Sequence, residues 1–206
     1  MSIVKLSNNG VKNATAFGSI TGLGSMTFIK KLTASSSSTL SYVDGASSVV
    51  LDNTYKEYLF TFNNIHPATN GANLTFQSST NTGSSYGVTA TTTCFIARHH
   101  EDDSATALVY QTSDDEAQST NFLRLSSGTG NGNDECLSGT LQIFNPSSTT
   151  FVNHFICRNQ YYNDSDICID WYMAGYFNTT SAVDALQFKF STGNIDAGDI
   201  CLYGIA

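Results

Sequence analysis

Charged residues and proline are scarce in this sequence. Asp, Glu, Lys and Arg make up 13% of the 206 residues, and only two residues are proline. The formal net charge is −8, so the chain lacks the broad basic surface that neutralises nucleic-acid phosphates. We therefore expect no direct binding to DNA or RNA. The adjacent Lys30 and Lys31 are better explained as lysines that protect the edge of a sheet.

Long apolar segments are also missing. No stretch approaches the roughly 20 consecutive apolar residues that a membrane-spanning helix requires. The first ten residues, MSIVKLSNNG, contain no apolar core of a secretory signal. These observations predict a protein that is made in a cytoplasm and does not enter a membrane.

The sequence lacks a complete motif of a catalytic, metal or phosphate site. Residues 83–87 read GSSYG and match the letters of a G-x-S-x-G nucleophile turn, but they lie in a polar turn region without the following helix that such a turn needs. There is no GxxxxGK or GxGxxG phosphate loop and no CxxC pair. We expect no catalytic residues, no cofactor and no enzymatic activity. In a reducing cytoplasm the five cysteines are expected to be buried small side chains or free thiols, without disulfides. They are Cys94, Cys136, Cys157, Cys168 and Cys201.

Two acidic segments are the best candidates for binding a cation. Residues 99–103 read HHEDD and residues 114–116 read DDE, and histidine with carboxylates can ligate a divalent ion. The spacing matches no defined ligand motif, and neighbouring side chains at the end of a strand point in opposite directions. Solvated loops without a metal are therefore the favoured interpretation. Four residues remain weak candidates, for example at a symmetry axis: Asp102, Asp103, Asp114 and Asp115.

Period-two alternation of apolar and polar residues is the strongest positive signal. It is clearest between residues 55 and 77, where two groups of apolar residues occupy every second position. These are Tyr58, Phe60 and Phe62, then Ala72, Leu74 and Phe76. Pro67 and Gly71 mark a turn between the groups, because proline fixes φ and glycine tolerates a positive φ. The pattern predicts two paired strands that form the centre of the core.

Similar patterns occur along the rest of the chain, without helical periodicity of useful length. Residues 140–144 and 151–157 predict a hairpin, and residues 42–43 and 49–51 predict two short strands around Asp44-Gly45. Further strands are predicted at residues 26–32, 91–97, 107–110, 122–125, 167–173, 186–190 and 200–203. With many short strands separated by turn residues, the predicted fold class is all-β, an antiparallel two-sheet β-sandwich of jelly-roll type.

Four aromatic residues near the C-terminus allow two explanations. Trp171, Tyr172, Tyr176 and Phe177 could line a face that binds sugars. Their alternation favours packing in the core and at a subunit interface instead.

Residues 1–24 differ from the rest of the chain. They are small, polar and rich in glycine, with isolated apolar residues that cannot form a core. We expect an extended N-terminal arm over residues 1–24 and one β-sandwich domain over residues 25–206. The arm could add a strand to the edge of a neighbouring sheet; the alternative is a disordered tail. Its candidate interaction residues are Ile3, Val4, Lys5, Leu6, Val11, Lys12 and Phe17.

Four segments carry a resemblance to a known family. They read IKKLTASSSSTLSYVDG, YKEYLFTFNNIHPATNGANLTFQSST, SGTLQIFNPSST and AGYFNTTSAVDALQFKFSTGNIDAGDICLYGI. Together they account for 87 of the 177 residues between 29 and 205, and the last segment is the most specific. The chain resembles virion structural proteins of tailed phages of marine bacteria, including cyanophages and pelagiphages. Such proteins are described as tail-fibre-like, as decoration proteins or simply as structural. The resemblance implies a component of the particle and transfers no catalytic residue.

Three classes of function follow from these observations. The first is a capsid decoration (cement) protein on the outside of the shell, and the short chain favours it. The second is a tail fibre or appendage domain that binds host surface glycans, and the third is a soluble glycan-active enzyme, which would need carboxylates at a defined separation. We expect the first, with localisation in the virion after synthesis in the host cytoplasm. The expected partners are the major capsid protein or a tail component, with a homotrimer as the working unit.

Overall fold

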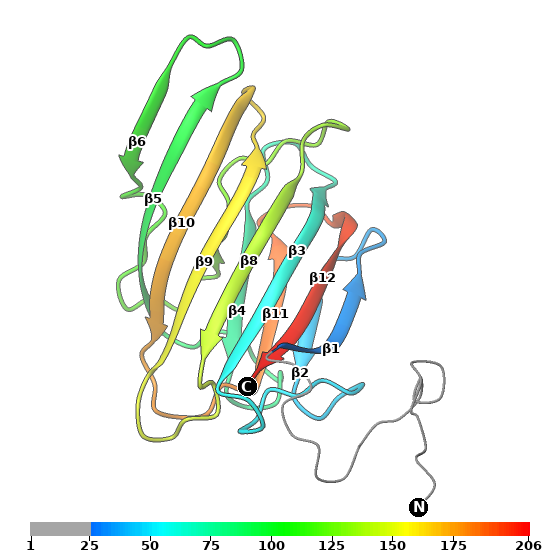
Figure 1. Ribbon diagram of the computed structural model, residues 1–206, viewed down its shortest axis with the longest axis vertical. Coiled ribbons are helices and arrows are strands. Elements are labelled where there is room, and N and C mark those ends of the chain that lie inside the picture. Colours follow the sequence, from blue (N-terminus) through cyan, green and yellow to red (C-terminus); the bar gives the residue numbers. More distant parts are fainter. Residues whose placement is uncertain (1–25) are drawn as a thin grey trace, which may run out of the picture.

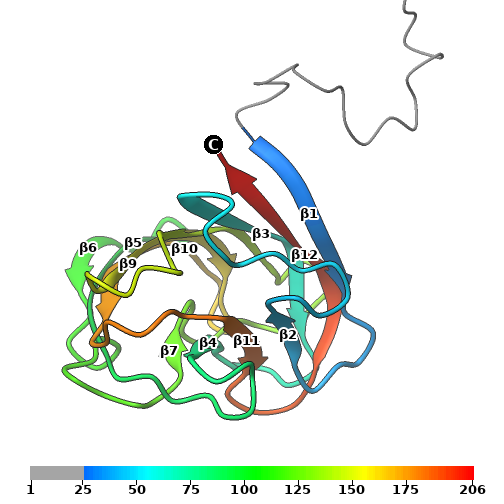
Figure 2. The ribbon, with the colours of Figure 1, turned by 90° about the horizontal axis from the view of Figure 1, so that it is seen from below.

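The computed structural model describes residues 26–206, which form twelve β-strands and no helix. The strands make two antiparallel sheets of eight and four strands, which face each other as a sandwich (Figures 1 and 2). The larger sheet contains β1 (Met26–Thr33), β3 (Glu57–Pro67), β5 (Ala90–His100), β6 (Thr106–Tyr110), β8 (Leu137–Phe144), β9 (Asn153–Tyr162), β10 (Ile167–Phe177) and β12 (Ile195–Ile205). The smaller sheet contains β2 (Leu40–Val43), β4 (Leu74–Ser79), β7 (Leu123–Arg124) and β11 (Ala185–Phe190). The all-β, two-sheet prediction is confirmed.

The chain passes repeatedly between the two sheets. Spatial order in the large sheet is β1-β12-β3-β8-β9-β10-β5-β6, and in the small sheet it is β2-β11-β4-β7. Strands β1, β3, β8 and β12 therefore alternate along the chain with β2, β4, β7 and β11. The remaining strands, β9-β10 and β5-β6, lie together on one side of the large sheet (Figure 1). We call these four strands the sheet extension.

The core between the sheets is built on aromatic rings. The Phe188 ring of β11 lies 5.3 Å from Phe60 and 5.5 Å from Phe62, both on β3, measured between ring centroids. Phe76 of β4 adds a ring 6.3 Å from Phe188 and 5.4 Å from Phe155 of β9. All five side chains are buried. Because burying each such side chain contributes roughly 1.5–3 kcal/mol, this cluster is a main source of stability.

The predicted alternation in residues 55–77 is confirmed, but the predicted pairing is wrong. Tyr58, Phe60 and Phe62 are buried at alternate positions, and Gly71 has a positive φ of 70° in the turn. However, β3 pairs with β12 and β8, whereas β4 pairs with β11 and β7 in the other sheet. The segment between the strands crosses the roughly 10 Å between packed sheets, so the two strands face each other across the core.

Two further predicted turns have different outcomes. The hairpin around residues 145–148 is confirmed, since β8 and β9 pair in antiparallel register. The turn at Asp44-Gly45 is present, with Gly45 at a φ of 74°. Residues 49–51 form no strand, which corrects that prediction. The Asp44 carboxylate instead accepts a hydrogen bond of 2.8 Å from the Leu51 N–H and holds this segment as a loop.

The two edges of the large sheet differ in chemistry. β1 forms one edge, carries Lys30 and Lys31, and contains a register shift between Phe28 and Lys30. The prediction of edge lysines is therefore confirmed. β6 forms the other edge, and its sequence Thr-Ala-Leu-Val-Tyr contains no charge and no proline.

The predicted N-terminal arm lies outside the described residues, and so does the boundary at residue 24. The same is true of its interaction candidates, namely Ile3, Val4, Lys5, Leu6, Val11, Lys12 and Phe17. The division into an arm and a sandwich therefore stays a prediction.

Candidate functional site

The outer face of the sheet extension carries a row of stacked side chains from three neighbouring strands. Tyr172 of β10 is paired in register with Phe95 of β5 and with Arg158 of β9. The Phe95 and Tyr172 rings are nearly parallel, with 4.7 Å between centroids and 4° between planes. The Arg158 guanidinium lies over the Tyr172 ring, 4.9 Å from its centroid. We call Arg158, Tyr172 and Phe95 the aromatic ladder.

A carboxylate fixes one end of the aromatic ladder. Asp170 accepts hydrogen bonds from Arg158 at 2.7 and 3.1 Å and from the Tyr172 hydroxyl at 3.0 Å. The Arg158 bonds hold the pKa of Asp170 below its usual value, and donation to Asp170 raises the pKa of Tyr172. The ladder therefore has a defined geometry before any partner binds.

The geometry of the aromatic ladder determines what it can bind. Phe95 and Arg158 lie on opposite sides of β10, so both faces of the Tyr172 ring are occupied. The spacing of the two rings equals the spacing of adjacent strands, so the rings stand upright on the sheet and present their edges outward. A sugar ring binds an aromatic side chain through an open face, so this arrangement suits packing against another protein surface.

Exposed apolar side chains surround the aromatic ladder. Leu108 and Tyr110 of β6 lie beside it, with 74% and 49% of their surface exposed, and Ile156 of β9 is 53% exposed. Phe95 itself is 41% exposed. Exposed apolar residues gathered on one face are typical of a protein–protein interaction surface.

A groove lies next to the aromatic ladder on the same face. It has a volume of about 550 Å³ and lies over Ala174, whose small side chain separates Ile156 from Thr93 in the register of the sheet. His154 and Tyr176 form part of its wall, with 6.0 Å between ring centroids. The groove is predominantly apolar and open to solvent.

The four aromatic residues singled out from the sequence separate into two pairs. Trp171 and Phe177 are completely buried between the sheets. Tyr172 and Tyr176 lie on the opposite, outer face of β10. Core packing is thus confirmed for one pair, and no single face contains all four. The sequence interpretation missed Phe95, Arg158 and Asp170, although the alternation of β5 and β10 placed Phe95 and Tyr172 opposite to the buried residues.

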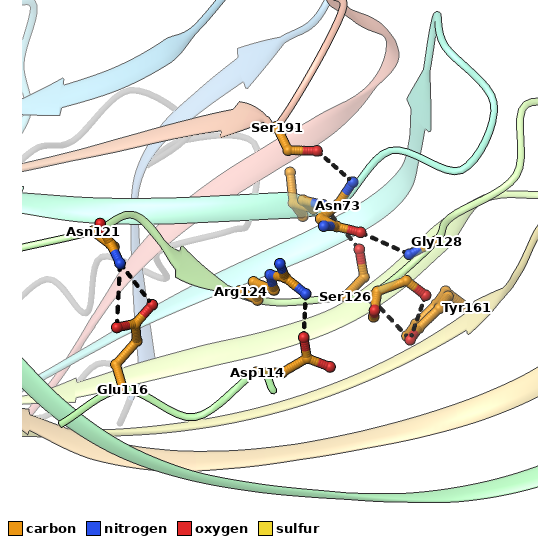
Figure 3. A network of polar contacts seen from close by, with 11 residues as sticks. Asn73, Asp114, Glu116, Asn121, Arg124, Ser126, Gly128, Tyr161 and Ser191 are labelled. Atoms are coloured by element: carbon orange, nitrogen blue, oxygen red, sulfur yellow. Dashed lines mark hydrogen bonds and ion pairs between the residues drawn. The ribbon is translucent and has the colours of Figure 1, made fainter. Parts of the chain in front are cut away.

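A polar network closes the side of the sandwich where the small sheet ends at β7. Arg124 of β7 forms an ion pair with Asp114, whose carboxylate is almost fully buried, and the two side chains point toward one another in Figure 3. The Tyr161 hydroxyl accepts from the Ser127 N–H at 3.0 Å and donates to the Ser127 carbonyl at 3.1 Å. These bonds attach the loops that follow β6 and β7 to the interior of the sandwich. We assign this network a role in stability.

The structure does not bring the four candidate cation ligands together. Asp102 and Asp103 lie in the turn before β6, whereas Asp114 and Asp115 follow its other end. Asp114 is paired with Arg124, and Asp115 accepts a hydrogen bond of 2.8 Å from the Tyr110 hydroxyl. Within residues 26–206, no group of three or more His, Cys, Asp or Glu side chains is arranged to hold a metal ion.

All five cysteines lie in the described part of the chain and are free. Cys94, Cys157 and Cys201 are buried, Cys136 is partly buried and Cys168 is exposed. Burial raises the pKa of Cys94 to about 12 and also raises the pKa of Cys157. Low reactivity of these two thiols follows, because the thiolate is the nucleophilic form.

Comparisons with known proteins identify no relative. No family model matches this chain, and neither a curated protein nor a solved structure matches it. Among residues 26–206 there is also no helix that is long and apolar enough to cross a bilayer.

Proposed function

We propose that this chain is a non-enzymatic virion structural protein, a capsid decoration protein on the outside of a phage shell. The outer face of the sheet extension is the observation that carries the proposal. Its aromatic rings are stacked with their edges outward, and exposed apolar side chains surround them. Such a face fits contact with other protein subunits better than it fits a catalytic centre. The resemblance of four sequence segments to phage structural proteins supports the same class.

We further propose that the sandwich is a jelly roll with two added hairpins. Eight strands occur in the orders β1-β12-β3-β8 and β2-β11-β4-β7, and successive strands alternate between the sheets. This is the strand arrangement of two interleaved Greek keys. β5-β6 and β9-β10 are then insertions that widen one sheet and carry the aromatic ladder. Jelly rolls are common in capsid proteins, which is consistent with a place on the shell.

The proposed partners are the major capsid protein and two further copies of this chain in a homotrimer. A tail component is the alternative partner. Within residues 26–206, five of the eight exposed large apolar side chains lie on the sheet extension, and a subunit contact would cover them. They are Phe95, Leu108, Val109, Tyr110 and Ile156. Synthesis in the host cytoplasm agrees with five free thiols.

A second candidate function has support from one observation. The groove beside Tyr176 and His154 is large enough to hold one or two sugar units, at about 550 Å³. A tail fibre or appendage domain that binds host glycans would use this groove. Within the described residues, the aromatic ring nearest to Tyr176 is that of His154, at 6.0 Å between centroids, whereas the Tyr172 ring has Phe95 at 4.7 Å.

Substitutions on the outer face test the proposal. Ile156→Lys and Tyr172→Ala should abolish binding of the purified protein to particles that lack it, measured by co-sedimentation and electron microscopy. Phe151→Lys is a matched control, since Phe151 is 73% exposed but lies in the loop between β8 and β9. Binding should place the protein on the shell, and polysaccharides and esters should not be turned over. Location on the tail, with glycan binding lost in Tyr176→Ala, would support the second candidate and contradict the first.

A further inference from the structure

The edge strand β6 offers an open backbone for pairing. β6 is the last strand of the large sheet, and no strand of residues 26–206 pairs with its outer side. The His100 N–H donates to the Ala105 carbonyl at 3.0 Å, and the Gln111 N–H donates to the Cys94 carbonyl at 2.9 Å. Because backbone groups alternate in direction along a strand, the N–H and C=O groups of residues 106, 108 and 110 point away from β5.

β6 lacks the features that normally protect an edge strand. Natural edges are protected by lysine, proline, bulges or a covering segment. The opposite edge, β1, has Lys30, Lys31 and a register shift. The pairing of β6 with β5 is regular from His99 to Phe95, and β6 carries no charge. Leu108, at its centre, is 74% exposed.

The charges around β6 indicate what kind of strand it accepts. Asp102 and Asp103 precede it, and Asp115 and Glu116 follow it. Antiparallel pairing with the β6 of a second copy would bring the acidic start of one strand to the acidic end of the other. The like charges at these ends would repel each other, whereas a basic segment paired with β6 would be attracted to them.

The N-terminal segment of this chain has the matching chemistry. Residues 1–25 contain two lysines and no acidic residue, so the formal charge of −8 divides into +2 on this segment and −10 on residues 26–206. Ser2–Leu6 contains an apolar, β-branched run with Lys5 and has the length of β6. Residue 26 begins β1, at the sheet edge opposite to β6 (Figure 1).

We infer that β6 is the acceptor for the N-terminal segment around Ser2–Leu6 of a neighbouring copy, which adds a ninth strand to the large sheet. Main-chain hydrogen bonds to residues 106, 108 and 110 supply the contact, and Lys5 lies near the acidic ends of β6. Donor and acceptor are different surfaces, so the contact is heterologous, and the proposed homotrimer requires that three such contacts close into a ring. The inference rests on the proposed self-association and is independent of where the protein lies on a particle.

Hydrogen exchange of the β6 amides tests this inference on the full-length protein. The Leu108 and Tyr110 amides should exchange about tenfold or more slowly in the self-associated protein than in the dilute monomer. Cross-linking of a mixture of ¹⁴N- and ¹⁵N-labelled chains should join Lys5 of one copy to the acidic residues beside β6 of another.

A pair of substitutions at one residue separates backbone pairing from side-chain packing. Leu108→Pro removes an N–H that points away from β5, so the β5–β6 hydrogen bonds stay intact. It should abolish protection and self-association, whereas Leu108→Ala, which keeps the N–H, should preserve both. If Leu108→Pro does not fold, excess synthetic peptide of residues 1–12 added to the wild-type protein should dissociate the assembly instead.

Each other outcome overturns a defined part of the inference. Self-association that persists with unprotected Leu108 and Tyr110 amides rejects β6 as the acceptor and leaves the proposed trimer in place. If the protein is monomeric at every concentration, both the β6 contact and the proposed trimer are rejected. If Lys5 is cross-linked only to residues of its own copy, the neighbouring chain is rejected as the donor. If the β6 amides stay protected after removal of residues 1–24, the N-terminal segment is rejected as the occupant.

Discussion

The hydroxyl of Tyr42 donates a hydrogen bond to the main-chain carbonyl of Ile200, with 2.5 Å between the two oxygens. Tyr42 belongs to β2 of the small sheet and Ile200 to β12 of the large sheet, so this bond joins the two layers of the sandwich. Both residues are completely buried. The bond therefore fixes the position of one sheet relative to the other.

Tyr42→Phe should destabilise the protein without changing the fold. The aromatic contacts with Phe60 and Phe188 are kept, but a buried hydrogen bond is lost, at a cost of about 1–2 kcal/mol in the free energy of unfolding. Urea denaturation measures this difference. Tyr55→Phe is the control, because Tyr55 also packs against the core but belongs to the partly buried residues. Equal stability of wild type and Tyr42→Phe would show that the bond contributes nothing.

Stability should fall as the solution becomes alkaline. Burial raises the pKa of Tyr58 to about 12 and raises the pKa of Tyr42 and Tyr161 further. The unfolded chain therefore loses these protons first, at its ordinary tyrosine pKa near 10, and stability falls with rising pH above that value. Each such tyrosine lowers the free energy of unfolding by about 1.4 kcal/mol per pH unit over the range in which it is ionised only in the unfolded state. Denaturation curves between pH 8 and pH 11 measure the slope, which should be smaller in Tyr42→Phe.

Removing Arg124 should destabilise the protein more than neutralising its partner. Arg124→Met leaves the buried Asp114 carboxylate without its ion pair, which should lower the free energy of unfolding by about 3 kcal/mol. This loss is at the lower end of the range for buried ion pairs, because Arg124 is partly exposed. Asp114→Asn should cost less, because it removes the charge together with the pair. The double variant should recover part of the loss. Additive effects in this cycle would mean that the two residues do not interact.

The five thiols should differ in reactivity in the folded protein. Cys168 is exposed and should be alkylated first, whereas Cys94 and Cys157 are buried with raised pKa values and should react only after unfolding. Mass spectrometry without reductant should find all five modified in the unfolded chain. A pair that stays protected after unfolding would reveal a disulfide and contradict this prediction.

A chain that begins at Gly24 should fold, with the melting temperature of the dilute wild-type monomer. The described residues 26–206 form twelve strands in two sheets with a buried core between them. If residues 1–24 are an attachment arm, the shortened protein should fail to join particles or its partner. Normal incorporation would reject the arm, and loss of folding would place these residues in the core.

The sequence by itself determined the fold class and much of the burial. Alternation at Tyr58, Phe60 and Phe62 correctly predicted an inner face, because the side-chain period of a strand is two whatever its neighbours are. The adjacent Lys30 and Lys31 likewise predicted an edge strand. Both features are local, so they can be inferred from a few consecutive residues.

Apart from the β8–β9 hairpin, only the tertiary structure decided which strands pair and which side chains meet. The alternation in β3 and β4 is the same whether they pair in one sheet or face each other across the core, and packing of Phe76 against Phe155 selects the second arrangement. Arg158, Tyr172 and Phe95 come from three strands, and their contact depends on the register of β9, β10 and β5. Register is set by long-range packing, which no short stretch of sequence contains.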